Sequence, residues 1–301
     1  MITTQDYAFN GNGPAWDEVE QVLRQRALRQ PVAINDFFER VIVVNLERRP
    51  DRWANVTASL QRVGIRAERY VAVDGQTSGI LKEYEAYIAR PSTSMSVGEL
   101  PIRNFVEFYR GEGSQAARVA FFEQLLQKKA ITSGAWGCLK SMSAILQKAL
   151  HDGVASLLVL EDDVIFHRRT TDLFSAALVD LPDDWRILQL GTMQHEWSED
   201  WISWCSPILY KTKFGSIGAH AVGIRAEAIP FLLEEIARMD LPYDVGPLSA
   251  ATRTMPSYVI YPNIAIQRFE TSSDINSSGF IAANSKEAVS RKFRWTLGDY
   301  G

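Results

Sequence analysis

The chain has 301 residues, a hydrophobic fraction of 46% and a net charge of −4, as expected of a folded protein with a substantial core. This acidic balance argues against broad electrostatic capture of nucleic acid, which needs a basic surface. The two cysteines, Cys138 and Cys205, are too few for a disulfide framework. The sequence has no apolar run of the roughly 20 residues that span a bilayer and no secretion signal at its start, so we expect a cytoplasmic protein.

The first half of the chain begins with a β-α-β pattern. Residues 16–30 carry apolar side chains at helical spacing and predict a helix in an N-terminal appendage, residues 1–38. Residues 41–44, Val-Ile-Val-Val, predict a buried central strand. A helix then begins at Pro50 and ends before Gly64, and residues 69–73 predict a second strand. This order is typical of the start of an α/β sheet.

The remaining elements predict one doubly wound α/β domain, residues 39–275, followed by a C-terminal helical tail, residues 276–301. Helix breakers are frequent in an insertion at about 76–130, which we expect to be a long surface excursion with a helix only at 116–128. A helix over 136–150, capped by Thr132 or Ser133, leads into a strand at 157–160. Further strands are expected at 186–190, 219–224 and 257–261, and a helix at 227–239.

The strand at 157–160 ends in three adjacent carboxylates, Glu161, Asp162 and Asp163. Clustered carboxylates repel one another and resist burial unless a cation or hydrogen-bond donors offset them. Alternation along a strand directs Glu161 and Asp163 to one side and Asp162 to the other. Two carboxylates on one side form a hard oxygen site suited to Mg²⁺ or Mn²⁺. The alternative is a strand followed by a solvated turn.

Several segments, taken in order, resemble the pattern of glycosyltransferase family 25, which includes bacterial lipooligosaccharide and collagen galactosyltransferases. They are Asn45 to Arg52, Val73 to Gly75, Gly134 to Ser141, Leu160 to Val164, Leu181 to Trp185, Gly218 to Ala221, Tyr243 to Val245, Tyr261-Pro262, Gln267 and Ser273 to Ile275. The resemblance covers roughly residues 40–275. One departure is Met142, where the family usually has a histidine after the serine equivalent to Ser141.

The resemblance implies a GT-A type fold and a divalent metal, Mn²⁺ or Mg²⁺, held by an acidic motif. It also implies inverting transfer of a hexose, foremost galactose from UDP-galactose, to a saccharide acceptor such as a lipooligosaccharide or surface polysaccharide. One alternative keeps the fold but glycosylates a protein or a modified nucleobase. Another is a catalytically degenerate scaffold that binds a nucleotide sugar, which the missing histidine supports.

The same resemblance, with strand-end placement, assigns the candidate donor and metal residues. We expect Glu161 and Asp163 to hold the metal. We expect Arg49 to lie on the exposed face of the helix that begins at Pro50. For Arg52, donor binding and a place on this exposed helix face both stay open. The candidate donor-binding residues are Asn45, Leu46, Arg48, Arg52, Asp74, Gly137, Ser141, Glu161 and Asp162.

Inverting transfer needs a base to take the proton of the acceptor hydroxyl. Asp244 is the first candidate, with a helix or turn cap as its alternative. His220 is the second candidate, with a hydrogen-bonded core histidine as its alternative.

The acceptor is expected to contact an aromatic run in a loop, because aromatic faces pack against sugars. The candidate residues are Trp197, Trp201, Trp204 and Gln267, and we expect at least one of the tryptophans to be buried. In the C-terminal tail, residues 291–295 mix cations with aromatics. They could make a peripheral contact with the inner face of a membrane, or form a helix end packed by Phe293 and Trp295.

Overall fold

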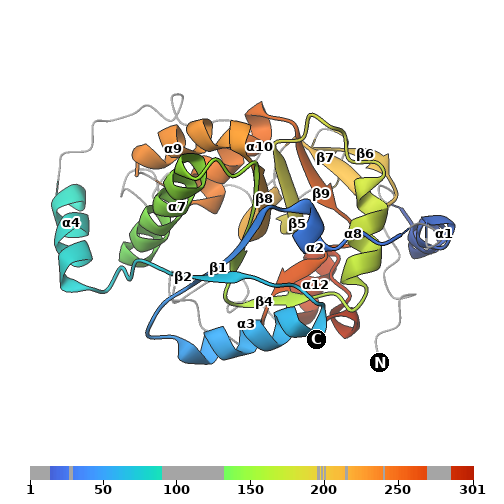
Figure 1. Ribbon diagram of the computed structural model, residues 1–301, viewed down its shortest axis with the longest axis horizontal. Helices are drawn as coiled ribbons and strands as arrows, with labels where there is room; N and C mark the ends of the chain where they lie inside the picture. Colours follow the sequence, from blue (N-terminus) through green and yellow to red (C-terminus); the bar gives the residue numbers. More distant parts are fainter. Residues whose placement is uncertain are drawn as a thin grey trace, which may run out of the picture.

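The computed structural model describes residues 14–26, 30–89, 132–194, 197, 199, 201–213, 216–239, 241–269 and 286–301. A central sheet has helices on both faces (Figure 1). Its strands, in spatial order, are β2 (Glu68–Val71), β1 (Arg40–Asn45), β3 (Ser156–Glu161), β8 (Ser216–Arg225), β5 (Ile187–Gln194), β9 (Ser257–Ile260), β7 (Leu209–Thr212) and β6 (Ile202–Ser206).

The sheet is mixed. Strand β1 pairs in parallel with both β2 and β3, β5 pairs in parallel with β9, and β8 lies antiparallel between β3 and β5. The predicted α/β class is confirmed, and the strands expected at 41–44, 157–160, 186–190, 219–224 and 257–261 are all present. The loop expected to carry the aromatic wall is instead an antiparallel hairpin of β6 and β7. A separate ribbon pairs β4 (Val164–Phe166) with β10 (Ala265–Gln267).

Two apolar layers sandwich the sheet. Helices α7 (Ser133–His151), α9 (Ile229–Ala237) and α10 (Ser249–Thr254) cover one face, while α3 (Pro50–Arg62) and α8 (Thr170–Leu178) cover the other (Figure 1). Alternate strand residues supply each layer, as Val159 and Leu160 do on β3. The local signals are as expected, since the Thr132 hydroxyl caps α7 by accepting from Ala135 N at 3.1 Å. Gly64 follows α3 with φ of +71°.

The N-terminal helix α1 (Trp16–Arg26) packs against α8. Its Val19 and Leu23 are 0% and 3% exposed and belong to the same core layer as α3 and α8. A short helix α2 (Ile34–Phe37) follows, and Phe37 stacks on Trp185 with ring centroids 5.6 Å apart. The proposed domain boundaries at 38 and 275 stay a prediction.

Part of the insertion expected to be irregular is helical. Helix α4 (Ser78–Ile88) packs Tyr84 and Tyr87 against Trp136 of α7, with ring centroids 6.2 and 4.6 Å apart. The prediction was wrong for this stretch because tertiary packing by aromatic side chains outweighs its weak amphipathic pattern. The helix predicted at 116–128 lies outside the described residues.

The C-terminal tail folds back onto the sheet domain. Helix α12 (Lys286–Phe293) is followed by Trp295 and a short 3₁₀ turn, Leu297–Asp299. Phe293 and Trp295 are 2% and 1% exposed, so a membrane contact through these rings would require them to leave the core. Across the described ranges, no helix is both long and apolar enough to cross a bilayer.

The start of α7 packs closely against the loop after β2. A Cβ built on Gly137 would lie 2.5 Å from Val73 O, and one built on Gly75 would lie 1.9 Å from Ser133 O. The buried Ser141 hydroxyl accepts from Val73 N at 2.8 Å and donates to Gly137 O at 2.8 Å. Gly137 and Ser141, expected to bind the donor, therefore hold the loop that carries Asp74.

The substitution Gly137→Ala tests this close approach. Alanine favours a helix interior by about 1 kcal/mol over glycine, but overpacking against backbone atoms costs about 1–3 kcal/mol. Because the added Cβ would meet backbone atoms at 2.5–2.8 Å, the upper end of this cost applies. We expect a net loss of about 2 kcal/mol in the free energy of unfolding, measured by urea denaturation. Gly79→Ala in α4 is the matched control, because nothing lies within 4 Å of its Cβ. Equal stability of G137A and wild type would contradict the close contact.

Candidate functional site

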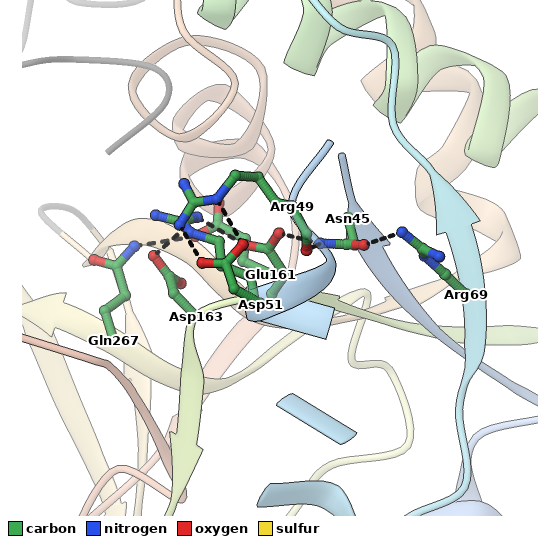
Figure 2. Close-up of polar contacts among 9 residues, drawn as sticks. Asn45, Arg49, Asp51, Arg69, Glu161, Asp163 and Gln267 are labelled. Carbon is green, nitrogen blue, oxygen red and sulfur yellow. Dashed lines mark hydrogen bonds and ion pairs between the residues drawn. The ribbon is translucent and has the colours of Figure 1, made fainter. Parts of the chain in front are cut away.

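The three carboxylates lie where β1 and β3 end side by side. Strand β1 ends at Asn45, β3 ends at Glu161, and Val44 is the parallel partner of Glu161. Asp162 and Asp163 form the turn from β3 into β4. Ligands of open α/β sheets bind at the carboxyl ends of parallel strands, and Figure 2 shows the acidic turn facing Gln267 of β10 on one side and Asn45 on the other.

Both side-chain oxygens of Asp162 accept hydrogen bonds from other side chains of the protein. Its side chain is 8% exposed, its Oδ2 accepts from Asn45 Nδ2 at 2.6 Å, and its Oδ1 accepts from Arg52 Nη1 at 2.8 Å. Both oxygens of this buried carboxylate therefore have charged or amide donors, which offsets its desolvation. Asn45, Arg52 and Asp162, all expected to bind the donor, form one internal cluster.

Glu161 and Asp163 are less completely satisfied. Glu161 Oε2 accepts from Gln267 Nε2 at 3.0 Å, and Asp163 Oδ2 lies 3.9 Å from Arg52 Nη1. Asp163 Oδ1 is buried, and no described residue donates to it. Burial, together with the charges of Asp163 and Asp244, raises the pKa of Glu161 to about 8. Burial raises the pKa of Asp163 to about 6, against the lowering effect of Arg52.

The two candidate bases have different surroundings. Asp244 begins a short π-helical segment, Asp244–Leu248, and burial raises its pKa. The charge of Asp244 in turn raises the pKa of Glu161 and of Cys138. His220 is 0% exposed, and its Nε2 lies 3.1 Å from Ala265 O. Burial lowers the pKa of His220 to about 4. Asp244 therefore acts electrostatically on the carboxylate Glu161. His220 has the contacts expected of a hydrogen-bonded core histidine.

The other expected donor residues lie at the turns after β1 and β2. Arg48 Nε donates to Asp74 Oδ2 at 2.7 Å, and this partly exposed pair joins the two turns. Leu46 O accepts from Arg49 N at 3.0 Å. Arg49 pairs with Asp51 at 2.8 Å, and its guanidinium lowers the pKa of that exposed carboxyl to about 2.

The expected acceptor residues are brought together only in part. Trp201 is 2% exposed, which confirms that at least one tryptophan is buried. Trp197 and Trp204 stack on each other, with ring centroids 6.3 Å apart. Trp204 belongs to β6, separated from β3 by four intervening strands, β8, β5, β9 and β7. Of the four residues, only Gln267 has a described contact with the carboxylates.

Two arginines that sequence reasoning missed also adjoin the acidic turn. Arg268 N donates to Asp163 O at 2.8 Å, and the Arg268 charge lowers the pKa of Asp163. Arg69 Nη2 donates to Asn45 Oδ1 at 2.5 Å. Arg268 adjoins Gln267 in the sequence, a signal that could have found it. Arg69 lies in a short, largely exposed strand whose pattern carries no such signal.

A hard divalent cation would fit between Glu161 and Asp163. The fit rests on their raised pKa values and on the buried oxygen of Asp163, since a nearby positive charge stabilises both carboxylates. In the described part of the chain, no group of three or more His, Cys, Asp or Glu side chains has a metal-binding arrangement. Two carboxylates alone suit Mg²⁺-type sites, which take their other ligands from phosphates and water.

The fold and this cluster define an α/β protein with three carboxylates at the carboxyl end of a strand in its central sheet. The profile of glycosyltransferase family 25, described as an LPS biosynthesis protein family, matches residues 38–245. The chain therefore belongs to glycosyltransferase family 25.

Curated relatives match about half of the chain. "Probable inactive glycosyltransferase 25 family member 3" of Rattus norvegicus is 30% identical over 166 residues, covering 52% of this chain and 23% of the relative. The inactive glycosyltransferase 25 family member 3 of Mus musculus is 30% identical over 163 residues, or 52% and 22%. The chain thus spans less than a quarter of their lengths. Among solved structures, mannose-1-phosphate geranyltransferase from Thermus thermophilus is 11% identical over 73% of this chain and 72% of its own, with a TM-score of 0.33, a weak likeness.

The raised pKa values predict a falling stability as pH increases. The folded-state pKa of Glu161 is about 8 and that of Asp163 about 6, above their ordinary values of 4.5 and 3.8. Between the ordinary and the folded-state pKa of each carboxyl group, the folded protein holds a proton that the unfolded chain has released. The contribution of these groups to the free energy of unfolding therefore falls as pH rises. We expect this decline in urea denaturation without divalent metal between pH 7 and pH 8, above the range in which the lowered pKa of the buried His220 gives the opposite slope.

The substitution Glu161→Gln should weaken this pH dependence and raise the free energy of unfolding at pH 8 by about 1 kcal/mol or more. The amide removes the cost of burying a charge at this position and the repulsion with Asp163. Glu85→Gln, at an exposed position of α4, is the control. A pH dependence of E161Q equal to that of wild type would contradict the repulsion.

Proposed function

We propose that this protein is a metal-dependent inverting glycosyltransferase that transfers a hexose, foremost galactose from UDP-galactose, to a saccharide acceptor. The observation that carries the proposal is the pair Glu161 and Asp163, two partly buried carboxylates at the end of β3 in a chain of family 25. A divalent cation held by this pair would offset their repulsion and would attract the diphosphate of a nucleotide sugar.

In this proposal Glu161 and Asp163 hold the metal, and Asp162 keeps the turn in place. When bound, the divalent ion neutralises the charge that develops on the departing diphosphate. Arg48 and Asp74 lie at the turns after β1 and β2, where the nucleotide of a doubly wound sheet binds.

Asp244 takes the proton of the acceptor hydroxyl at a carboxylate oxygen. Burial raises its pKa, which makes it a stronger base than an exposed aspartate. Gln267 orients Glu161 through its amide hydrogen bond of 3.0 Å, and in this proposal it also contacts the saccharide acceptor.

A thermal-shift panel of nucleotide sugars with Mn²⁺ or EDTA tests the donor and the metal together. A ligand that binds only the folded state raises stability by about 2.7 kcal/mol at 100 times its dissociation constant. We expect the largest rise with UDP-galactose and Mn²⁺ together, and its loss in Asp163→Asn. Asp36→Asn, at an exposed position, is the control. A donor-induced rise in melting temperature that neither EDTA nor D163N reduces would refute the metal site.

Turnover with Asp244→Asn tests the base. General base catalysis contributes about 10²- to 10⁴-fold, so we expect kcat to fall by a factor in this range while donor binding persists. His220→Asn should instead lower thermal stability, because its ring is buried, and leave kcat of the folded protein nearly unchanged. A loss of kcat in H220N that exceeds the loss in D244N would assign the base to His220.

A second candidate is a nucleotide-sugar-binding protein without transferase activity. The rat, mouse and human relatives are named inactive, and Met142 replaces the histidine that is usual in the family. This candidate predicts donor-induced stabilisation in the same panel but no transfer and no donor hydrolysis.

A further inference from the structure

We propose that Arg69 is a positioning residue for the carboxylate pair and acts through the side-chain amide of Asn45 on Asp162. The inference rests on the proposed function, because it concerns how Glu161 and Asp163 are presented to the metal and donor.

A continuous chain of hydrogen bonds links the four side chains. Arg69 Nη2 donates to Asn45 Oδ1 at 2.5 Å, and Asn45 Nδ2 donates to Asp162 Oδ2 at 2.6 Å. Arg52 Nη1 completes the chain by donating to Asp162 Oδ1 at 2.8 Å. Figure 2 shows Asn45 between Arg69 of β2 and the acidic turn after β3. These hydrogen bonds therefore link β2, the end of β1, the turn after β3 and helix α3.

The chemistry of the partners permits only one orientation of the Asn45 amide. A guanidinium has donors alone, and an ionised carboxylate has acceptors alone. With Arg69 on one side and Asp162 on the other, the amide oxygen must face Arg69 and the amide nitrogen must face Asp162. A flipped amide would place donor against donor and acceptor against acceptor, and at 1% exposure Asn45 has little water to compensate.

The fixed amide determines where the acidic turn lies. It draws Asp162 toward α3 and away from Glu161 and Asp163, so that two carboxylates rather than three adjoin the ligand. Groups beyond the direct ligands typically change metal affinity or activity by about 10- to 100-fold, because they orient those ligands. Arg69 is such a group, because it orients Glu161 and Asp163 without contacting the metal.

Arg69 is itself held without being part of the core. It lies on the edge strand β2 as the partner of Val43, its side chain is largely exposed, and its guanidinium lies 5.1 Å from the ring centroid of Trp53 on α3. This cation-π contact steadies the guanidinium between α3 and β2. Because the position is exposed, replacing Arg69 should change the site more than the stability of the fold.

The first test measures Mn²⁺ and UDP-galactose affinity by titration calorimetry in Arg69→Gln, Arg69→Lys and the control Arg66→Gln. We expect R69Q to bind Mn²⁺ about 10- to 100-fold more weakly, with a melting temperature near that of wild type. R69K keeps a donor toward Asn45 and should recover most of the affinity, and R66Q should match wild type. R69Q binding as tightly as wild type would overturn the proposal.

The second test exchanges the amide and the carboxylate, in Asn45→Asp combined with Asp162→Asn. The exchange keeps the net charge and every hydrogen bond of the chain, with only the 3.2 Å contact of Asn45 Nδ2 to Arg49 O lost. Each single variant mispairs like groups and should lower the melting temperature. The double variant should recover most of that loss, and a double variant no more stable than the singles would overturn the proposal.

The two tests separate this inference from the proposed function. If wild type binds neither Mn²⁺ nor a nucleotide sugar, the proposed function fails. Recovery of the melting temperature in the exchange variant would still support the hydrogen-bond chain. If wild type binds both ligands and R69Q does so equally well, the proposed function stands and the role of Arg69 fails.

Discussion

The repulsion among three adjacent carboxylates at the end of β3 is the constraint on which the site depends. The protein offsets one charge internally, because Asp162 receives hydrogen bonds from Asn45 and Arg52. It leaves the other two partly buried and close together, with raised pKa values. A pair that is compensated only in part costs folding free energy, and such a cost is tolerated where binding or catalysis requires it.

The segments that resemble the family pattern divide into framework and ligand roles once the contacts are known. Gly137 and Ser141 bring α7 against the loop that carries Asp74, through a missing Cβ and a hydroxyl with two hydrogen bonds. Asn45 similarly joins strands rather than projecting from them. The segments that resemble the family pattern thus include residues that hold neighbouring elements of the fold together.

Most elements could be predicted from the sequence, because hydrophobic periodicity and capping are local signals. Strand β3, helix α3 after Pro50 and helix α7 after Thr132 lie within a few residues of their predicted bounds. The contacts among remote residues could not be predicted in this way, as for Arg69 with Asn45 or Gln267 with Glu161. Their partners are set by strand order, and strand order in a mixed sheet follows from packing rather than from any one segment.

The ribbon of β4 and β10 has a consequence for how the molecule is made. Strand β10 pairs with β4 and places Gln267 on Glu161 and Arg268 on the main chain of Asp163. During synthesis the acidic turn emerges about a hundred residues before these partners, a separation that slows the closing contact. The turn therefore first has the upstream Asn45 and Arg52 as partners, and it gains the contacts of Gln267 and Arg268 only after β10 has been made.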